Sequence, residues 1–121
     1  MKEQAAKWQD DNMLQYRLTS ASARSARKGI AFDITIEHLE MLWTDCLGLC
    51  HYTGKPMVLS KDSKRDSVSI DRLDSGIGYV PGNVVLCRSS CNTMKSDMSE
   101  AEFAGAILDL YEWAASYLGV K

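Results

Sequence analysis

The sequence lacks any long apolar segment. None of its hydrophobic runs approaches the roughly 20 residues that a membrane-spanning helix needs. The first twelve residues, MKEQAAKWQDDN, are polar where a secretory signal peptide would be apolar. We therefore expect no membrane partner and a location in the cytoplasm.

Proline and glycine are also scarce, with 2 and 8 among 121 residues, and no internal repeat or low-complexity segment is present. This scarcity excludes fibrous and disordered classes, and the 45% hydrophobic and 25% charged residues are ordinary for a soluble globular protein. The length suits one unit. We expect a single domain over residues 1 to 121.

An overall excess of positive charge is missing too, because the net charge is −2. The charges are uneven, however. Residues 96 to 121 hold five acids against Lys121, which leaves 13 bases and 11 acids before them. Four bases with no acid among them lie in one short run, namely Arg17, Arg24, Arg27 and Lys28. This run either faces a phosphate backbone, with Arg24, Arg27 and Lys28 binding DNA, or is a solvated helix face.

Helical periodicity predicts two helices in the first part of the chain. Residues 2 to 26 favour a helix, and we interpret residues 1 to 30 as a basic helical arm. Asp33 or Thr35 can cap a second helix that ends near Gly48.

A third long helix is predicted at the other end. Ser99 followed by Glu102 is a capping-box pattern. Apolar residues then recur at helical spacing, so we expect residues 99 to 121 to form an amphipathic helix that packs against the core.

The middle of the chain predicts a hairpin followed by a short helix. Residues 68 to 73 alternate apolar and polar side chains, a glycine-containing turn follows, and residues 83 to 87 form a second β-branched strand. After Cys87 a helix is expected to begin at a serine cap. The fold class predicted is therefore α+β.

Three polar side chains belong to these elements: Asp71 on the first strand, Asn83 at the start of the second, and Asn92 on the helix. This order brings them together at one end of the hairpin. Such a cluster can hold a hard cation through oxygen ligands. A divalent ion there would polarise a phosphodiester oxygen.

The stretch SIDRLDSGIGYVPGNVVLCRSSCNTMKSD, together with an upstream Cys-x-Tyr-Thr-Gly turn, resembles the HNH endonucleases, also called ββα-metal or His-Me finger nucleases. The resemblance is to the small phage-type members; it runs from about residue 34 to 98 and is specific over residues 69 to 97. It implies a ββα-metal core in residues 31 to 98, flanked by the two terminal helical regions.

The same resemblance implies an activity. The expected reaction is hydrolysis of DNA phosphodiesters, by nicking or by cleavage of both strands, with Mg²⁺ or another divalent cation. The hairpin helix would lie at the minor groove. The expected setting is a phage- or bacterium-encoded protein inside the host cell.

Residue roles follow from the resemblance position by position. Asp71 and Asn92 match the metal ligands, and Asn83 matches the residue that ties the hairpin loop and orients the catalytic residue. Lys95 stands where a helix lysine often lies close to DNA phosphate. Arg72, by the chemistry of its guanidinium group, can bind or neutralise a phosphate. The implied catalytic set is therefore Asp71, Arg72, Asn83 and Asn92.

One departure from the familiar pattern concerns the general base. Where that pattern has Asp-His, this chain has Asp71-Arg72, and an arginine does not lose its proton at working pH. The phage-type pattern commonly carries the same arginine. The candidate bases are Asp74, Tyr79, His51 or a metal-bound hydroxide, whereas His38 is expected to be structural.

The four cysteines form two pairs, Cys46 with Cys50 and Cys87 with Cys91. Many HNH proteins carry a structural zinc on four cysteines at about these places, although the usual spacing within a pair is two residues and here it is three. The alternatives are a structural Zn²⁺ site and four buried or half-buried thiols.

Two rival functions stay open. The first is a non-catalytic nucleic-acid-binding module with an HNH-like fold, which Arg72 favours. The second is a zinc-stabilised protein-interaction domain, which the acidic C-terminal helix favours.

Overall fold

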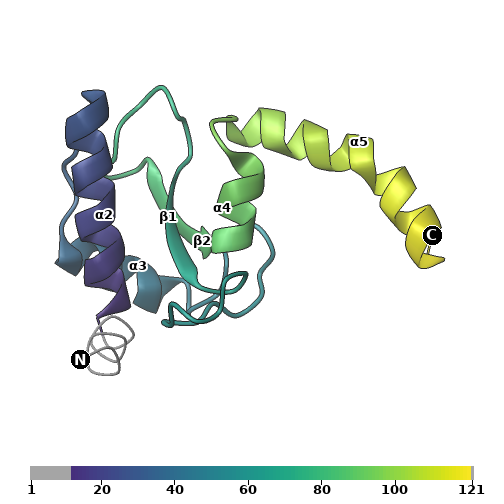
Figure 1. Ribbon diagram of the computed structural model, residues 1–121, viewed down its shortest axis with the longest axis horizontal. Helices are drawn as coiled ribbons and strands as arrows, with labels where there is room; N and C mark the ends of the chain where they lie inside the picture. Colours follow the sequence, from purple (N-terminus) through teal and green to yellow (C-terminus); the bar gives the residue numbers. More distant parts are fainter. Residues whose placement is uncertain (1–11, 121) are drawn as a thin grey trace.

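The computed structural model describes residues 12 to 120, which form an α+β domain, so the predicted class is confirmed (Figure 1). The part of the predicted first helix before residue 12 lies outside the described residues. In chain order the elements are α2 (Met13–Lys28), α3 (Ile36–Asp45), β1 (Val68–Arg72), β2 (Val84–Arg88), α4 (Ser89–Lys95) and α5 (Glu100–Leu118). The hairpin lies between α2 and α4 (Figure 1).

Helix α2 is part of the core. Met13, Leu18 and Ala21 recur on one face at helical spacing and are buried with the side chains of the hairpin. The helix ends at Gly29, whose left-handed conformation (φ 68°) costs little without a Cβ atom. The region predicted as an arm therefore forms, from residue 13 on, one wall of the domain.

Helix α3 begins at Thr35, which is one of the two predicted caps. Its hydroxyl accepts a hydrogen bond from the backbone N–H of His38 at 3.2 Å. Leu39, on the inner face, is completely buried. The helix thus covers the face of the hairpin that it shares with α2.

The two strands pair antiparallel, with Ile70 opposite Leu86 and Asp71 opposite Val85. Successive side chains of a strand point to opposite faces. Ile70 therefore packs into the core beside α2 and α3, whereas Asp71 turns towards α4. This alternation places the Asp71 carboxylate on the α4 side of the hairpin.

Helix α4 follows β2 directly, and the predicted serine cap is wrong. The N-cap residue is Arg88, whose side chain makes no capping hydrogen bond. The hydroxyls of Ser89 and Ser90 are the reason, because they donate to the backbone carbonyls of Ser67 and Arg65 at 2.8 and 3.0 Å. The serines therefore attach the helix to the segment that precedes β1.

Helix α5 begins with the predicted capping box: Ser99 and Glu102 exchange both hydrogen bonds. The expectation that this helix packs along the core is wrong. Its first turn is anchored by Phe103, whose ring meets that of Tyr52 at 5.3 Å, but the rest projects away from the domain (Figure 1). The physical reason is that α2, α3 and α4 already close the core.

The apolar character of α5 falls short of what a bilayer requires. Within residues 12 to 120, no helix combines the length and the hydropathy needed to cross a membrane.

Candidate functional site

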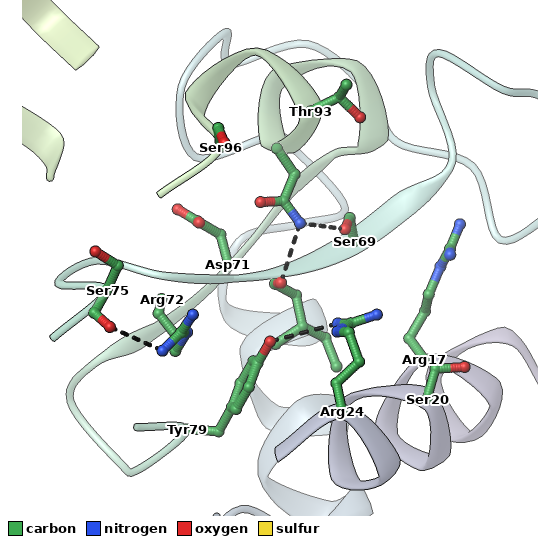
Figure 2. A pocket seen from close by; sticks show the side chains of 12 residues that line it. Arg17, Ser20, Arg24, Ser69, Asp71, Arg72, Ser75, Tyr79, Thr93 and Ser96 are labelled. Atoms are coloured by element: carbon green, nitrogen blue, oxygen red, sulfur yellow. Dashed lines mark hydrogen bonds between the residues drawn. The ribbon is translucent and has the colours of Figure 1, made fainter. Parts of the chain in front are cut away.

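A polar pocket of about 310 Å³ opens between α2, β1 and α4 (Figure 2). Three guanidinium groups, a carboxylate and an amide contribute to its lining: Arg17, Arg24, Arg72, Asp71 and Asn92. The structure thus brings together residues that lie far apart in the sequence. Its walls are mostly hydrogen-bonding groups, which suits a charged ligand more than an apolar one.

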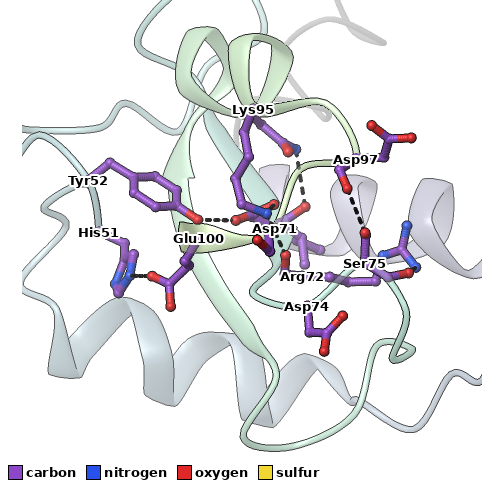
Figure 3. Close-up of polar contacts among 12 residues, drawn as sticks. His51, Tyr52, Asp71, Arg72, Asp74, Ser75, Lys95, Asp97 and Glu100 are labelled. Carbon is purple, nitrogen blue, oxygen red and sulfur yellow. Dashed lines mark hydrogen bonds and ion pairs between the residues drawn. The ribbon is translucent and has the colours of Figure 1, made fainter. Parts of the chain in front are cut away.

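Asp71 is held by two neighbours inside the domain (Figure 3). The hydroxyl of Tyr52 donates to Oδ2, and the ammonium of Lys95 lies 3.2 Å from Oδ1. Burial, followed by the hydrogen bond to Asp71, raises the pKa of Tyr52 well above its usual value, so the phenol stays a donor. The carboxylate is therefore fixed in position beside the pocket.

The structure places Lys95 differently from the expected phosphate contact. Its side chain is only 1% exposed, and its ammonium also donates to the backbone carbonyl of Arg72 at 2.8 Å. A buried ammonium needs a partner with opposite charge, and Asp71 supplies it. In this conformation Lys95 organises the site from inside and does not reach a ligand in the pocket.

Asn92 faces the pocket from α4. Its amide nitrogen donates to Ser69 Oγ at 2.7 Å and to the carbonyl of Ile70 at 3.2 Å, both on β1. The amide nitrogen is therefore committed to the strand, which leaves the carbonyl oxygen as the atom that can serve a ligand. Asp71 and Asn92 thus present one carboxylate and one amide to the same pocket.

This pair fits a hard divalent cation. Mg²⁺ prefers oxygen ligands and is usually held by one or two carboxylates, with waters and substrate phosphates completing the shell. Tyr52 and Lys95 use two of the roughly four acceptor positions of the Asp71 carboxylate. Across residues 12 to 120 no three His, Cys, Asp or Glu side chains gather as a metal site, so phosphate or water would have to supply the remaining ligands.

Arg72 lies on the opposite face of β1 from Asp71. Its guanidinium donates to the carbonyls of Ser75 and Ile77, at 2.9 and 3.4 Å, and lies 5.2 Å from the centre of the Tyr79 ring. These contacts fix a permanent positive charge at the edge of the pocket. The Arg72 guanidinium therefore holds the loop between the strands and also lines the pocket.

Asn83 lies on the loop between the strands. Its side-chain oxygen accepts from the N–H of Asp74 at 2.9 Å, and its nitrogen donates to the carbonyls of Asp74, Ile77 and Gly78 at 3.1, 3.3 and 2.9 Å. The residue is buried and does not line the pocket. It therefore acts on the site by fixing the loop that carries Tyr79.

Gly78 is needed for that loop to reach its place. A Cβ atom there would lie 2.2 Å from the backbone oxygen of Ala31, which no other residue could tolerate without a shift. The close approach lets Tyr79 exchange backbone hydrogen bonds with Ala31 and Asp33, at 2.9 and 2.7 Å. Tyr79 is thereby held beneath the pocket.

The three side chains proposed as general base differ in whether they line the pocket. His51 pairs with Glu100 at 2.9 Å, and Asp74 accepts from the backbone of Gly76 at 2.8 Å. Neither lines the pocket. Tyr79 does, and its hydroxyl accepts from Arg24 at 3.4 Å. Of the three candidate side chains Tyr79 alone lines the pocket, so Tyr79 and a metal-bound hydroxide stay as the candidate bases.

Two of the four basic residues of α2, Arg17 and Arg24, lie along one edge of the pocket. Residues 17, 20, 24 and 27 recur at intervals of three and four, so they share one helix face. Arg17 is tied to β1 through the carbonyl of Val68 at 2.8 Å, and Arg24 is exposed over the pocket. Arg27 and Lys28 continue beyond it in the last turn and do not line it.

Two contributors had no assigned role in the sequence analysis. Tyr52 belongs to the Cys-x-Tyr-Thr-Gly turn, but nothing local indicated that its hydroxyl reaches Asp71. Ser69 precedes Ile70 on β1, so its side chain points to the opposite face of the strand, towards α4 and Asn92. The alternation of apolar and polar residues in this segment could have predicted that direction.

The cysteines do not form one four-sulfur group. Cys50 Sγ and Cys91 Sγ lie 3.9 Å apart, whereas the thiol of Cys46 donates to the carbonyl of Trp43 at 3.5 Å. The structural zinc site of Cys46, Cys50, Cys87 and Cys91 stays a prediction.

Alkylation distinguishes the zinc and thiol alternatives. Burial raises the pKa of the Cys87 thiol, and that of Cys91, so both stay neutral and unreactive near pH 8. At Cys50 burial acts in the same direction, but hydrogen bonds from Thr53 and Arg88 outweigh it and lower the pKa. Iodoacetamide followed by mass spectrometry should modify the partly exposed Cys46 first and Cys87 last, with at least about a tenfold difference in rate.

Unfolding the protein in denaturant should make all four thiols react alike, which is the control. Joint protection of all four in the native protein, with one zinc released per chain on unfolding, would contradict the thiol interpretation.

Comparison with known proteins finds similarity to a phage protein. No protein-family model and no solved structure matches the chain. The chain is 26% identical over 86 residues to an uncharacterized 29.0 kDa protein in the dda-modA intergenic region of Enterobacteria phage T4. The aligned part is 71% of this chain and 33% of the phage protein, so the chain spans about a third of that relative's length. The chain is therefore similar to part of a phage protein whose own function is uncharacterized.

Proposed function

We propose that the protein is a metal-dependent DNA endonuclease of the HNH type, in which β1, β2 and α4 form the ββα-metal core. The observation that carries the proposal is the meeting of Asp71 and Asn92 at one pocket whose other charged walls are arginines. The order of strand, strand and helix, with Asn83 buried in the loop, is the order of the HNH motif.

The arginines would bind the scissile phosphate. Arg24 is exposed over the pocket and Arg72 is fixed at its edge, so two guanidinium groups face the same space. Because Lys95 neutralises Asp71, the pocket keeps an excess of positive charge, which favours a polyanion. A guanidinium group can also donate two parallel hydrogen bonds to two oxygens of one phosphate.

Asp71 and Asn92 would hold the divalent cation. When bound, Mg²⁺ or a similar ion would polarise a phosphate oxygen and stabilise the charge on the leaving oxygen. Asp71 is kept in place by Tyr52 and Lys95, and Asn92 by Ser69. The ligand oxygens therefore need little rearrangement, and such preorganisation is a main source of catalytic stabilisation.

The test is cleavage of supercoiled plasmid by purified protein with Mg²⁺, with Mn²⁺ or with EDTA. We expect nicked or linear product with either metal and none with EDTA. A gel-shift measurement on the same DNA, with EDTA present, reports binding separately. Absence of cleavage with every metal would refute the nuclease.

A non-catalytic DNA-binding module is the second candidate. The observation that favours it is the ion pair of Asp71 with Lys95, which leaves the pocket positive without any metal. A gel shift with no cleavage under any metal would support this function in place of the first.

Binding of phosphate by α2 gives a quantitative prediction. Changing Arg24 to glutamine removes one exposed charge from the pocket edge, so the affinity for duplex DNA should fall. The plot of log affinity against log salt should become shallower by about 0.9, the value expected for one lost phosphate contact. Fluorescence anisotropy across a salt series measures both.

The matched control is Lys55→Gln, which removes an exposed positive charge that does not line the pocket. An equal change of slope in both variants would show that Arg24 has no specific contact with phosphate.

A further inference from the structure

The outer part of α5 is an apolar surface without a partner in the described chain. Leu108, Trp113, Tyr117 and Leu118 are 73%, 67%, 77% and 70% exposed. Trp113 and Tyr117, one turn apart, stack on each other with ring centres 5.7 Å apart. Figure 1 shows this part of the helix extending beyond the rest of the domain. Residues 110 to 118 are called the α5 arm below.

An apolar groove of about 910 Å³ lies at the base of the same helix. Its walls come from the 52–53 turn, from α4 and from the first turns of α5, and include Tyr52, Met94, Phe103 and Ile107. Met94 is 56% exposed, although it is a large apolar side chain on a short helix. The chain thus carries an apolar projection and an apolar hollow, and neither is covered by the described residues.

The charges of α5 limit what can cover it. Glu102, Asp109 and Glu112 lie on one side of α5, Glu100 lines the groove and pairs with His51, and no base lies in the helix. A nucleic acid would be repelled by this helix. An apolar partner surface against Trp113 and Tyr117, in contrast, would leave Glu112 in solvent.

The size of the surface matches a stable protein interface. Covering an aromatic side chain buries about 150 to 250 Å², so the exposed apolar residues of α5 offer on the order of 800 Å², the usual share of one partner. Monomeric proteins rarely leave an apolar patch of this size in water.

We propose that the α5 arm of one copy of this chain occupies the groove of a second copy, and that the α5 arm of the second copy occupies the groove of the first. A two-fold axis makes the two contacts identical, so one interface covers both unpartnered surfaces of both chains. The protein is then a dimer held by reciprocal exchange of its last helices, with the pocket of Asp71 left open on each copy.

Sedimentation of the full chain, without DNA or metal, tests the proposal. Between about 1 and 100 µM protein the wild type should reach twice the 13.5 kDa mass of the chain. Trp113→Lys in the arm and Met94→Lys in the groove should each raise the dimer dissociation constant at least about 30-fold, the effect typical of a central interface residue. Glu112→Lys, beside Trp113 in the sequence, is the control and should leave the dimer intact.

Mixing the two defective variants tests reciprocity. A pair of Met94→Lys and Trp113→Lys chains keeps one intact arm and one intact groove, so the mixture should associate more tightly than either variant alone. Circular dichroism checks that each variant keeps its helices, and Tyr117→Lys replaces Trp113→Lys if the latter unfolds.

Three results would overturn the proposal: a wild-type monomer over the whole concentration range, equal weakening by Glu112→Lys and Trp113→Lys, or no gain on mixing. One consequence rests on the proposed function. A dimer with two nuclease sites should cut both strands and yield linear plasmid, whereas the Trp113→Lys variant should yield mainly nicked plasmid. Because sedimentation needs no cleavage, the interface and the nuclease can fail separately.

Discussion

Changing Asp71 to asparagine should abolish metal-dependent cleavage of plasmid and also destabilise the fold. The variant loses the carboxylate proposed to hold the cation, and a contribution of several kcal/mol to the transition state corresponds to at least about a thousandfold loss of rate. It also leaves the ammonium of Lys95, which is fully buried, without its counter-charge. Breaking such a pair lowers the free energy of unfolding by about 3 kcal/mol or more.

A second substitution separates the two effects. Asp71→Asn combined with Lys95→Met removes both charges of the buried pair, so no unpaired charge is left, and the amide oxygen introduced at position 71 can still accept from Tyr52. Urea denaturation should therefore show recovered stability in the double variant, while plasmid cleavage stays absent. Cleavage by the double variant would rule out Asp71 as a ligand of the catalytic cation.

Changing Asn83 to alanine should lower the free energy of unfolding by about 2 to 4 kcal/mol and reduce cleavage strongly. The side chain makes four hydrogen bonds inside the loop, and the buried carbonyls that it serves would lose their donor. Since the loop holds Tyr79 and the acceptors of Arg72, both pocket groups would lose their fixed positions. Urea denaturation and the plasmid assay measure the two effects.

Asn83→Asp is the matched comparison, because it keeps the oxygen that accepts from Asp74 and loses the donors to three carbonyls. A carboxylate facing those oxygens is disfavoured, so the introduced group should have a raised pKa in the folded protein. Its stability should then be higher at acid pH, where the carboxyl is protonated, and fall as the pH rises through that pKa. Equal stability of both variants and the wild type would show that these hydrogen bonds do not hold the loop.

The features that sequence analysis predicted well have local causes. The capping box of Ser99 and Glu102, the Thr35 cap and the two strands of the hairpin each depend on residues a few positions apart. The hydrogen bonds of Asn83 are also short-range, because its three partner residues all lie within nine positions of it. Short-range hydrogen bonds and periodicity are what a single sequence records most directly.

The features that it predicted poorly depend on contacts across the chain. Lys95 was expected at phosphate from its place in the HNH resemblance, whereas in the structure its burial depends on the distant Asp71. The amphipathic pattern of α5 predicted an apolar face correctly, yet the pattern does not say which surface covers that face. The link from Tyr52 to Asp71 spans 19 residues and leaves no periodic signal.

The position of α2 has a consequence for how the domain can be divided. Met13, Leu18 and Ala21 fill the core, while Arg17 and Arg24 on the same helix form a wall of the pocket. Folding of the hairpin and assembly of the basic wall are thus one cooperative event. The strand-strand-helix segment therefore depends on α2, because without that helix it would lose part of its core and two of the three arginines of the pocket.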